Sequence, residues 1–472
     1  MPGVDWIKKG WSTRTEWIIL GVVSLGGLAL RLYVIQFHPF VDFDGAFYIN
    51  YFRDRAWQGV FHPGYPLLIE LFRLIISDGF IAARMVSVVF GTLIAIPLFY
   101  LARHFMNPPG ALAATIIVVL NPLMIRYSAL PMSEMQFIFL ELLAFLCYVR
   151  GKPLLFGIVS GLAYLTRPEA VVFFVALALL DLWKKRNSQF PLRALLGFLL
   201  LALPYVIYLR VETGAWTMSP KTVNLREWET NWHANLKLES PPAGETPLME
   251  RWLASIKGYP ERMGNYIELL STFAGIPLCL LGVIGMVRAP NILLAGMLMF
   301  LFLPLFGLSP YDRFVLPYIP FLGVFALLAI ERVHRIPVKL AGFMLILVSY
   351  FWIAGYVSIP EDGTIEYYTA GIAMRPMTHR EDVFLDRKPY TAFYAGGRYV
   401  EIPNESVDSI LSFGRRIQAK YLVVSGRVTR TFRPQLTFVL YNDSTLNRLH
   451  LQTVYVADLP SGYGVRILQL PE

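Results

Sequence analysis

Two carboxylates stand two residues apart in a segment that is otherwise rich in aromatic residues. Residues 38–48 read HPFVDFDGAFY, with the acids at Asp42 and Asp44. A carboxylate in such a place can accept the proton of an attacking hydroxyl, or help to hold a cation beside a phosphate. The structural alternative is a pair of solvated loop acids. The surrounding aromatics and proline favour instead a loop packed on a membrane surface.

Six cationic residues form a second group with chemical potential. They lie at or near the ends of apolar segments, on the side opposite to the other basic clusters: Arg31, Arg84, Arg126, Arg167, Lys221 and Arg313. A single one is most simply explained by snorkelling to the interface. Six together indicate an anionic ligand such as a lipid phosphate, because the planar guanidinium group binds two phosphate oxygens at once.

Three further acids have less certain roles. Glu134 opens an apolar segment and is either a helix-terminal acid stabilised by the macrodipole or a second active-site carboxylate. Glu141 lies in the middle of the same segment, where an ionisable residue is a functional candidate by default. Glu169 follows Arg167-Pro168, where it can pair locally. The dispersed histidines show no metal-ligand spacing.

The composition indicates which elements position these residues. Of the 472 residues, 56% are apolar and 16% are charged, whereas about a quarter are charged in an average soluble domain. A bilayer accommodates such an excess of apolar residues. The net charge of +9 is assigned to short cytoplasmic loops. Nucleic acid is not an expected partner, because no nucleic-acid-binding motif accompanies the charge.

Apolar runs predict an α-helical polytopic membrane protein with about eleven transmembrane helices. The expected spans are 17–35, 83–103, 110–127, 133–149, 153–166, 168–183, 194–211, 266–287, 291–308, 313–330 and 339–358. Basic residues recur in alternate loops, which places the N-terminus in the cytoplasm. The long loops 36–82 and 212–265 and the C-terminal segment are then extracytoplasmic. A transmembrane domain of residues 1–358 is the result.

Residues 359–472 predict a soluble α/β domain. Short β-rich runs occur at 382–385, 421–424, 436–441, 454–456 and 465–468. Residues 407–418 have helical spacing, and Gly396-Gly397-Arg398 is a turn signal. We expect a lid or scaffold rather than a separate enzyme.

Five short motifs, taken in order and placed on one membrane face, resemble those of the GT-C type glycosyltransferases that use polyprenyl-phosphate sugars. The likeness is to the protein O-mannosyltransferase and aminoarabinose-transferase-like superfamily. The motifs are Asp44-Gly45-Ala46-Phe47-Tyr48, His62-Pro63-Gly64-Tyr65-Pro66, Ser133-Glu134, the segment GLAYLTRPE at 161–169, and Arg313-Phe314-Val315-Leu316-Pro317. Two departures stand out: Gly45 replaces a second acid that many members carry, and Gly64 replaces a proline.

The resemblance implies an inverting sugar transfer from a polyprenyl-phosphate donor to an acceptor hydroxyl on the outer face of the cell membrane, with mannose as one donor sugar. It implies Asp44 as the base, with Asp42 and Glu134 as further catalytic candidates. It assigns substrate binding to Tyr48, His62, Tyr65, Arg84, Arg167 and Arg313. No cofactor is required by the motifs, and a divalent cation is left open because Gly45 removes one acid. The acceptor is a protein, a glycolipid or a glycan.

Two other functions remain open on the sequence. A transporter or flippase of a lipid or glycolipid would use polar groups near the midplane, and Glu141 is the residue that supports this reading. A non-catalytic envelope assembly protein would use its C-terminal domain to bind a partner.

Overall fold

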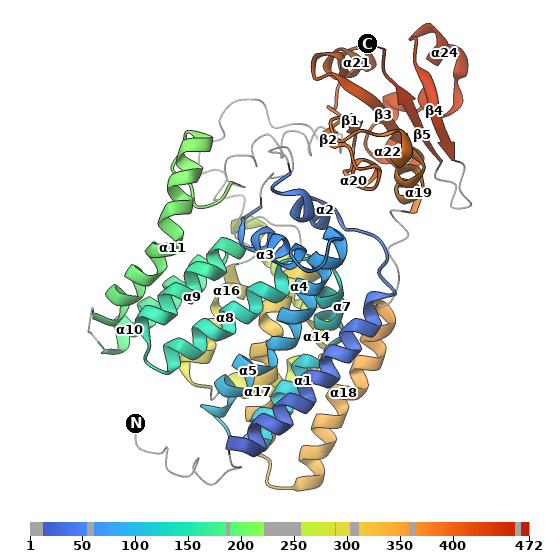
Figure 1. Ribbon diagram of the computed structural model, residues 1–472. Helices are drawn as coiled ribbons and strands as arrows, with labels where there is room; N and C mark the ends of the chain where they lie inside the picture. The colour runs from blue at the N-terminus through green and yellow to red at the C-terminus, as the bar shows by residue number, and fades with distance from the viewer. Residues whose placement is uncertain are drawn as a thin grey trace. The chain divides into compact units, whose positions relative to one another are not determined.

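The computed structural model describes residues 13–53, 61–185, 189–220, 256–287, 289–302, 311–357, 365–457 and 464–471. The chain divides into two compact units. The larger consists of Met1–His38, His62–Trp216 and Thr246–Ile359, and the smaller of Pro39–Phe61, Thr217–Glu245 and Pro360–Glu472. Figure 1 shows the helices of the larger unit and the sheet of the smaller one.

The described part of the larger unit is entirely helical. Its α-helices are α1 (Thr13–Ile35), α3 (Gly64–Arg73), α4 (Gly79–Leu93), α5 (Ala95–Arg103), α6 (Pro108–Val119), α7 (Pro122–Ala129), α8 (Glu134–Val149), α9 (Pro153–Thr166), α10 (Ala170–Lys185), α11 (Gln189–Thr213), α14 (Tyr259–Ala274), α15 (Ile276–Met286), α16 (Asn291–Phe302), α17 (Ile319–Glu331) and α18 (Ile336–Val357). Two 3-10 turns, η4 (Asp312–Phe314) and η5 (Leu316–Tyr318), precede α17.

The apolar helices identify a multi-pass membrane protein, as predicted. Among the described residues, five helical segments are long and apolar enough to cross a membrane, or up to seven if each of two bent pairs counts as one span. The predicted fold class is confirmed. The predicted number of about eleven spans is not, because several of the expected segments are helices shorter than a full crossing.

Two expected spans are not continuous helices. The run 110–127 is broken between α6 and α7 with a bend of 55°. There the side chain of Asn121 accepts hydrogen bonds from the backbone N–H groups of Leu123 and Met124 and so starts a new helix. The run 266–287 turns by 112° at Gly275, whose φ of 95° ends α14 before α15 begins. Apolarity alone does not reveal these breaks.

The centre of the larger unit is α17, in which every residue from Ile319 to Ile330 is buried. It packs against α6 and α15, and α9 packs against α8 and α11. At the crossing of α9 and α11, a Cβ on Gly157 would meet the carbonyl oxygen of Ala194. Small residues therefore let these two backbones approach closely, as is common between membrane helices.

The smaller unit contains a mixed sheet whose strand order is β2-β1-β3-β5-β4. The strands are β1 (Val383–Asp386), β2 (Arg398–Glu401), β3 (Ala419–Ser425), β4 (Gln452–Ala457) and β5 (Val465–Gln469). β1 pairs in parallel with β2 and β3, whereas β5 is antiparallel to β3 and β4. The helices of this unit are α2 (Phe43–Asn50), α19 (Ile365–Met374), α20 (Tyr390–Ala395), α21 (Val407–Arg416), α22 (Gly426–Thr431), α23 (Phe438–Tyr441) and α24 (Asp443–Arg448).

The prediction for this unit is wrong at two places. The run 436–441, expected to be a strand, forms a 3-10 turn followed by α23. Its buried residues Leu436 and Val439 are three apart, so they share one helical face. Strand β2 follows directly on the expected turn, in which Gly396 ends α20 with a φ of 86°. The run Arg398–Glu401 is too short and polar to be recognised as a strand.

The smaller unit also includes α2, which belongs to the first expected outer loop. Three contacts join this segment to the C-terminal part of the unit. The hydroxyl of Tyr394 accepts a hydrogen bond from the backbone N–H of Val41 at 2.8 Å. The ring of Phe47 meets the edge of Tyr399 with centroids 5.8 Å apart, and Arg53 donates to the carbonyl of Gly396. The two acids of the first loop are thus carried by the same unit as the sheet.

Candidate active site

The two loop acids lie at the start of α2. Asp42 is its N-cap residue and Asp44 lies in its first turn, and both side chains are half-buried. Acidic residues are common at such positions, because negative charge is stabilised near a helix N-terminus. The next residues of α2, Gly45 to Ile49, are buried, and the ring of Tyr48 packs on that of Phe61 at a tilt of 58°, with centroids 4.6 Å apart. Tyr48 therefore contributes packing to α2, and its substrate-binding role stays a prediction.

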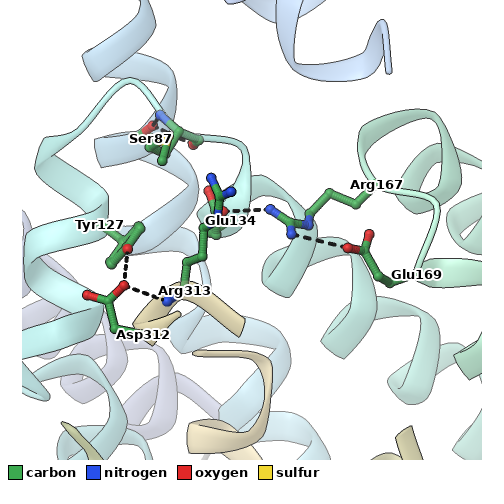
Figure 2. A network of polar contacts seen from close by, with 8 residues as sticks. Ser87, Tyr127, Glu134, Arg167, Glu169, Asp312 and Arg313 are labelled. Carbon is green, nitrogen blue, oxygen red and sulfur yellow. Dashed lines mark hydrogen bonds and ion pairs between the residues drawn. The ribbon is translucent and has the colours of Figure 1, made fainter. Parts of the chain in front are cut away.

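A buried ion-pair network in the larger unit joins two of the sequence motifs (Figure 2). The Nη1 atom of Arg167 lies 2.6 Å from Oε1 of Glu134, and its Nη2 atom lies 3.2 Å from Oε1 of Glu169. Glu134 is the first residue of α8, Arg167 is the C-cap of α9, and Glu169 stands just before α10. The Thr-Arg-Pro-Glu segment therefore turns between two helices so that its arginine faces the start of a third.

The guanidinium of Arg167 is held between two carboxylates in this network. Its substrate-binding role stays a prediction. Glu134 is only 2% exposed, and its Oε2 atom accepts no hydrogen bond among the described residues. A buried acceptor of this kind suits a hydroxyl donor, since leaving it without a partner costs free energy. Arg167 then serves to hold Glu134 in position.

A second network of polar contacts surrounds Asp312, which begins the 3-10 turn η4 that precedes α17. Its Oδ1 atom accepts from the Tyr127 hydroxyl at 2.6 Å and from the backbone N–H of Arg313 at 2.8 Å. The Nη1 atom of Arg126 lies 3.6 Å from Asp312 Oδ2. In Figure 2 the Arg313 side chain extends away from Asp312, on the side where Glu134 is drawn. Asp312 thus fixes the backbone of η4 and pairs with Arg126, which leaves the direction of the Arg313 guanidinium to be set by other contacts.

Two of the six cations tie helices together. Arg31 is fully buried and donates to the Ser128 hydroxyl and to the carbonyls of Gly27 and Val119. Arg84 donates to the carbonyl of Ala129 at 3.0 Å and to that of Ile35. The carbonyls of Val119, Ala129 and Ile35 belong to the last residues of their helices, where they have no partner within the helix. The bonds give Arg31 a structural role and anchor Arg84, whose part in substrate binding stays a prediction; Lys221 lies outside the described residues.

His38 is a residue that the sequence reasoning did not assign. Burial and the positive charges of Arg126 and Arg84 lower its pKa to about 4. The imidazole is therefore neutral at ordinary pH and lies close to two cations. Its only signal in the sequence is its position directly after the first apolar run.

His62 and Tyr65 are both buried in the larger unit. His62 packs against the rings of Tyr164 and Tyr205, with centroids 5.2 and 5.0 Å away. Tyr65 is fully buried, donates to the carbonyl of Ala83 at 2.7 Å and shares a hydrogen bond of 2.7 Å with the Ser87 hydroxyl. Tyr65 therefore supports the site by fixing α3 against α4. Substrate binding by either residue stays a prediction.

The departure at Gly64 has a structural reason. A Cβ at this position would lie 2.6 Å from the carbonyl oxygen of Leu165 and 2.9 Å from the backbone nitrogen of Thr166. Both atoms belong to the last turn of α9, next to Arg167. The start of α3 thus needs glycine in order to approach this helix end.

Metal ligation is not evident in the parts of the chain that the structure covers. Within them, no group of three or more His, Cys, Asp or Glu side chains is placed to hold an ion. A divalent cation stays an open question of the proposal.

A family model overlaps the segment that carries the Glu134–Arg167 network. Residues 61–208 match the family described as dolichyl-phosphate-mannose-protein mannosyltransferase. The segment contains His62, Tyr65, Arg84, Glu134 and Arg167. No curated protein sequence matches the chain.

Solved structures match nearly the whole chain. ArnT from Cupriavidus metallidurans bound to undecaprenyl phosphate aligns over 97% of this chain and 98% of its own, with 12% identity and a TM-score of 0.61. The oligosaccharyltransferase of Archaeoglobus fulgidus tethered to an acceptor peptide aligns over 99% of this chain and 75% of its own, with 14% identity and a TM-score of 0.60. AglB of that organism, in complex with an inhibitory peptide and a dolichol-phosphate, has 14% identity and a TM-score of 0.56, over 98% of this chain and 74% of its own.

These matches confirm the resemblance that the motifs indicate. The chain has the fold of these membrane proteins over almost its full length, including the part that carries the C-terminal sheet. At such low identity, the structural likeness establishes the fold.

Proposed function

We propose that this chain is a membrane glycosyltransferase that moves a sugar from a polyprenyl-phosphate donor to an acceptor hydroxyl with inversion at the anomeric carbon. The observation that carries the proposal is the buried Glu134–Arg167–Glu169 network, which lies inside the segment matched by the mannosyltransferase family model. Sugar hydroxyls are donors, and the open Oε2 atom of Glu134 is a buried acceptor.

The proposal assigns the phosphate of the donor to the larger unit. Arg313, with Arg126 and Arg84 as further cations, would stabilise the negative charge that develops on the leaving phosphate. Undecaprenyl phosphate in ArnT and dolichol-phosphate in AglB are ligands of proteins with the same fold, which supports a lipid-linked donor here. Mannose is the sugar suggested by the family description.

The proposal assigns the base to Asp44. The acceptor oxygen attacks the anomeric carbon, its proton moves to the Asp44 carboxylate, and the bond from the anomeric carbon to the phosphate oxygen breaks with its electron pair on polyprenyl phosphate. A base of this kind typically contributes about 10²–10⁴-fold in rate. Asp42 is the second candidate on the same helix. No covalent intermediate with the protein is needed.

The acceptor and the cellular side are parts of the same proposal. The acceptor peptide held by the Archaeoglobus enzyme supports a protein acceptor, with a glycolipid or a glycan as alternatives. The alternation of basic loops supports a cytoplasmic N-terminus and a reaction on the outer face of the cell membrane.

The direct test measures donor cleavage. Wild type and Asp44→Asn are purified at equal yield, supplied with polyprenyl-phosphate mannose and related donors plus an acceptor, and followed for release of polyprenyl phosphate. We expect release by wild type and a loss of at least about 10²-fold in the variant. Asp78→Asn is the matched control, since Asp78 only caps α4 by accepting from Ile81; it should keep its activity.

Full activity of Asp44→Asn would remove Asp44 from the mechanism and make Asp42 the next candidate. Failure of the folded wild type to release polyprenyl phosphate from any donor would contradict the glycosyltransferase assignment itself.

One observation favours a second candidate, a lipid transporter. Glu141 is 3% exposed, both of its oxygens lack a hydrogen-bond partner among the described residues, and it lines a small cavity with Phe137, Ser160 and Phe173. A transporter that moves protons through this acid would stop working as Glu141→Gln. The glycosyltransferase should keep its turnover in this variant, because the amide fills the same volume without a charge to bury. Flux of labelled lipid and donor cleavage, measured in the same proteoliposomes, separate the two.

A further inference from the structure

Charged residues gather at the carboxyl end of the parallel strands in the smaller unit. β1 ends at Asp386 and β2 ends at Glu401, and the loop after β1 carries Arg387 and Lys388. Asp386 is fully buried and accepts the backbone N–H of Lys388 at 3.3 Å. Arg387 pairs with Glu401 at 3.1 Å. In open α/β sheets this end of the strands is where ligands usually bind.

The helix that carries Asp44 packs on this end. The Nζ atom of Lys388 lies 4.5 Å from the centre of the Phe43 ring, and Phe43 is the first residue of α2. α2 also packs on α20, the helix that follows the Lys388 loop. A cation over an aromatic ring contributes about 0.5–2 kcal/mol, the higher value applying where water is excluded. Lys388 therefore holds the first turn of α2, in which Asp44 is the next residue.

Lys388 is surrounded mainly by negative charge. The charged groups that act on it are Arg387, Glu401, Asp44 and Asp386. Burial and Arg387 lower its pKa and the three carboxylates raise it, with a net pKa of about 8. The ammonium is thus mostly protonated at neutral pH. It is a positive charge that acts on Asp44 and Glu401 as well as on the buried Asp386.

We infer that Lys388 is a positioning residue for Asp44: it fixes the first turn of α2 through Phe43 and so sets where the Asp44 carboxylate lies. The inference rests on the proposed role of Asp44 as the base. It gives the C-terminal part of the chain a direct part in the reaction, in place of the lid or scaffold expected from the sequence. Lys388 itself acts through Asp44 and needs no contact with substrate.

The test compares Lys388→Met with Lys388→Arg in the full-length protein. In Lys388→Met we expect the turnover number kcat to fall at least about 10-fold with the KM for donor little changed. Lys388→Arg, which keeps the charge and can still lie over Phe43, should restore kcat. Arg448→Met, which removes one exposed cation from the same unit, should behave as wild type.

A second readout does not depend on activity. Backbone hydrogen exchange over residues 43–50 should speed up in Lys388→Met and return to the wild-type rate in Lys388→Arg. Unchanged exchange in Lys388→Met would overturn the inference, whether or not the wild type transfers sugar. Faster exchange with an unchanged kcat would also overturn it, because Lys388 would then hold the helix without positioning Asp44 for the reaction. Inactive wild type in every donor assay would contradict the proposed function, and with it the role of α2 in catalysis.

Discussion

At the scale of single residues, the arginines of the larger unit fall into two kinds. Arg31 donates to backbone carbonyls and one hydroxyl and is fully buried. Arg167 is balanced by two carboxylates. Arg313 differs from both, because its backbone N–H, and not its side chain, satisfies Asp312. Its guanidinium lies 5.4 Å from the centre of the Phe314 ring and is half-buried. Among these three, Arg313 is the one that the proposal assigns to the donor phosphate.

The first prediction therefore concerns Arg313→Gln. The backbone bond to Asp312 is retained, so we expect little change in thermal stability. The loss of a charge-assisted hydrogen bond, worth about 1.5–3 kcal/mol, should lower kcat/KM for the lipid donor by about 10- to 100-fold. The measurement is steady-state release of polyprenyl phosphate over a range of donor concentrations.

Arg73→Gln is the control for this prediction. Arg73 forms a solvated pair with Glu70 on α3 at 3.0 Å, and such surface pairs contribute little. It should leave donor kinetics unchanged. Equal kinetics of wild type and Arg313→Gln would remove Arg313 from the donor site and point to Arg126 instead.

At the scale of elements, helix ends position the chemistry. Glu134 begins α8, Arg167 caps α9, and Asp44 lies in the first turn of α2. Ends must approach one another closely to bring such residues together. Gly64 at the start of α3 makes such an approach to the last turn of α9.

Gly64→Ala tests how strictly this approach is required. The new Cβ would lie 2.6 Å from the Leu165 carbonyl oxygen, and backbone atoms cannot move aside as a flexible side chain can. We expect a loss of about 1–3 kcal/mol in the free energy of unfolding. We also expect lower turnover, because α9 ends at Arg167. Thermal unfolding in detergent micelles and donor cleavage provide the two measurements.

Gly26→Ala in α1 is the matched control, since its Cβ would meet nothing within 4 Å. Alanine should be neutral or slightly stabilising there. Similar behaviour of the two variants would show that α3 and α9 can separate without cost.

Much of the element structure could be predicted, and the exceptions share a cause. Long apolar runs predict where most of the apolar helices lie, because their composition is unlike that of other segments. They do not predict how many of these helices are long enough to cross the membrane. The breaks at Asn121 and Gly275 are not predicted, because an N-cap residue or a glycine with positive φ changes the direction of the chain without changing the apolarity of the segment. In the smaller unit, residues 436–441 have strand-like composition but bury Leu436 and Val439 on one helical face. Local composition does not determine whether a segment buries its apolar residues with the periodicity of a strand or with that of a helix.

At the scale of the whole molecule, the sequence predicts which residues matter better than which of them lie together. The motif spacing points to Asp44, Glu134, Arg167 and Arg313. It does not reveal that Asp44 is carried by the unit that contains the sheet, nor that Lys388, more than three hundred residues later, lies over the neighbouring Phe43. Contacts between segments so distant in sequence depend on the tertiary fold, which periodicity and local propensity do not predict.

The last prediction concerns the stability of the smaller unit, which holds Asp44. Burial raises the pKa of Asp386 from its ordinary 3.8 to about 7, although the backbone N–H groups of Lys388 and Arg387 favour its charged form. Between about pH 4 and pH 7 the folded unit retains a proton that the unfolded chain has released. Rising pH therefore favours unfolding across this window. Above about pH 7 both states are ionised at this residue and its contribution becomes constant.

Asp386→Asn should remove this dependence, because the amide oxygen can still accept from the Lys388 backbone and carries no charge. The measurement is hydrogen exchange of β1 and β3 in the full-length protein at pH 5 and pH 8, corrected for intrinsic exchange rates. In wild type, we expect protection of these strands to fall between the two pH values by more than in the variant. Asp408→Asn, at an exposed position of α21, should match wild type. An equal fall in wild type and Asp386→Asn would mean that Asp386 is ionised throughout and compensated by its neighbours. In that case Asp386 and Glu401 would both be permanently negative at the carboxyl end of the sheet. The positive charge of Lys388 would then mainly balance these two carboxylates and would act less on Asp44.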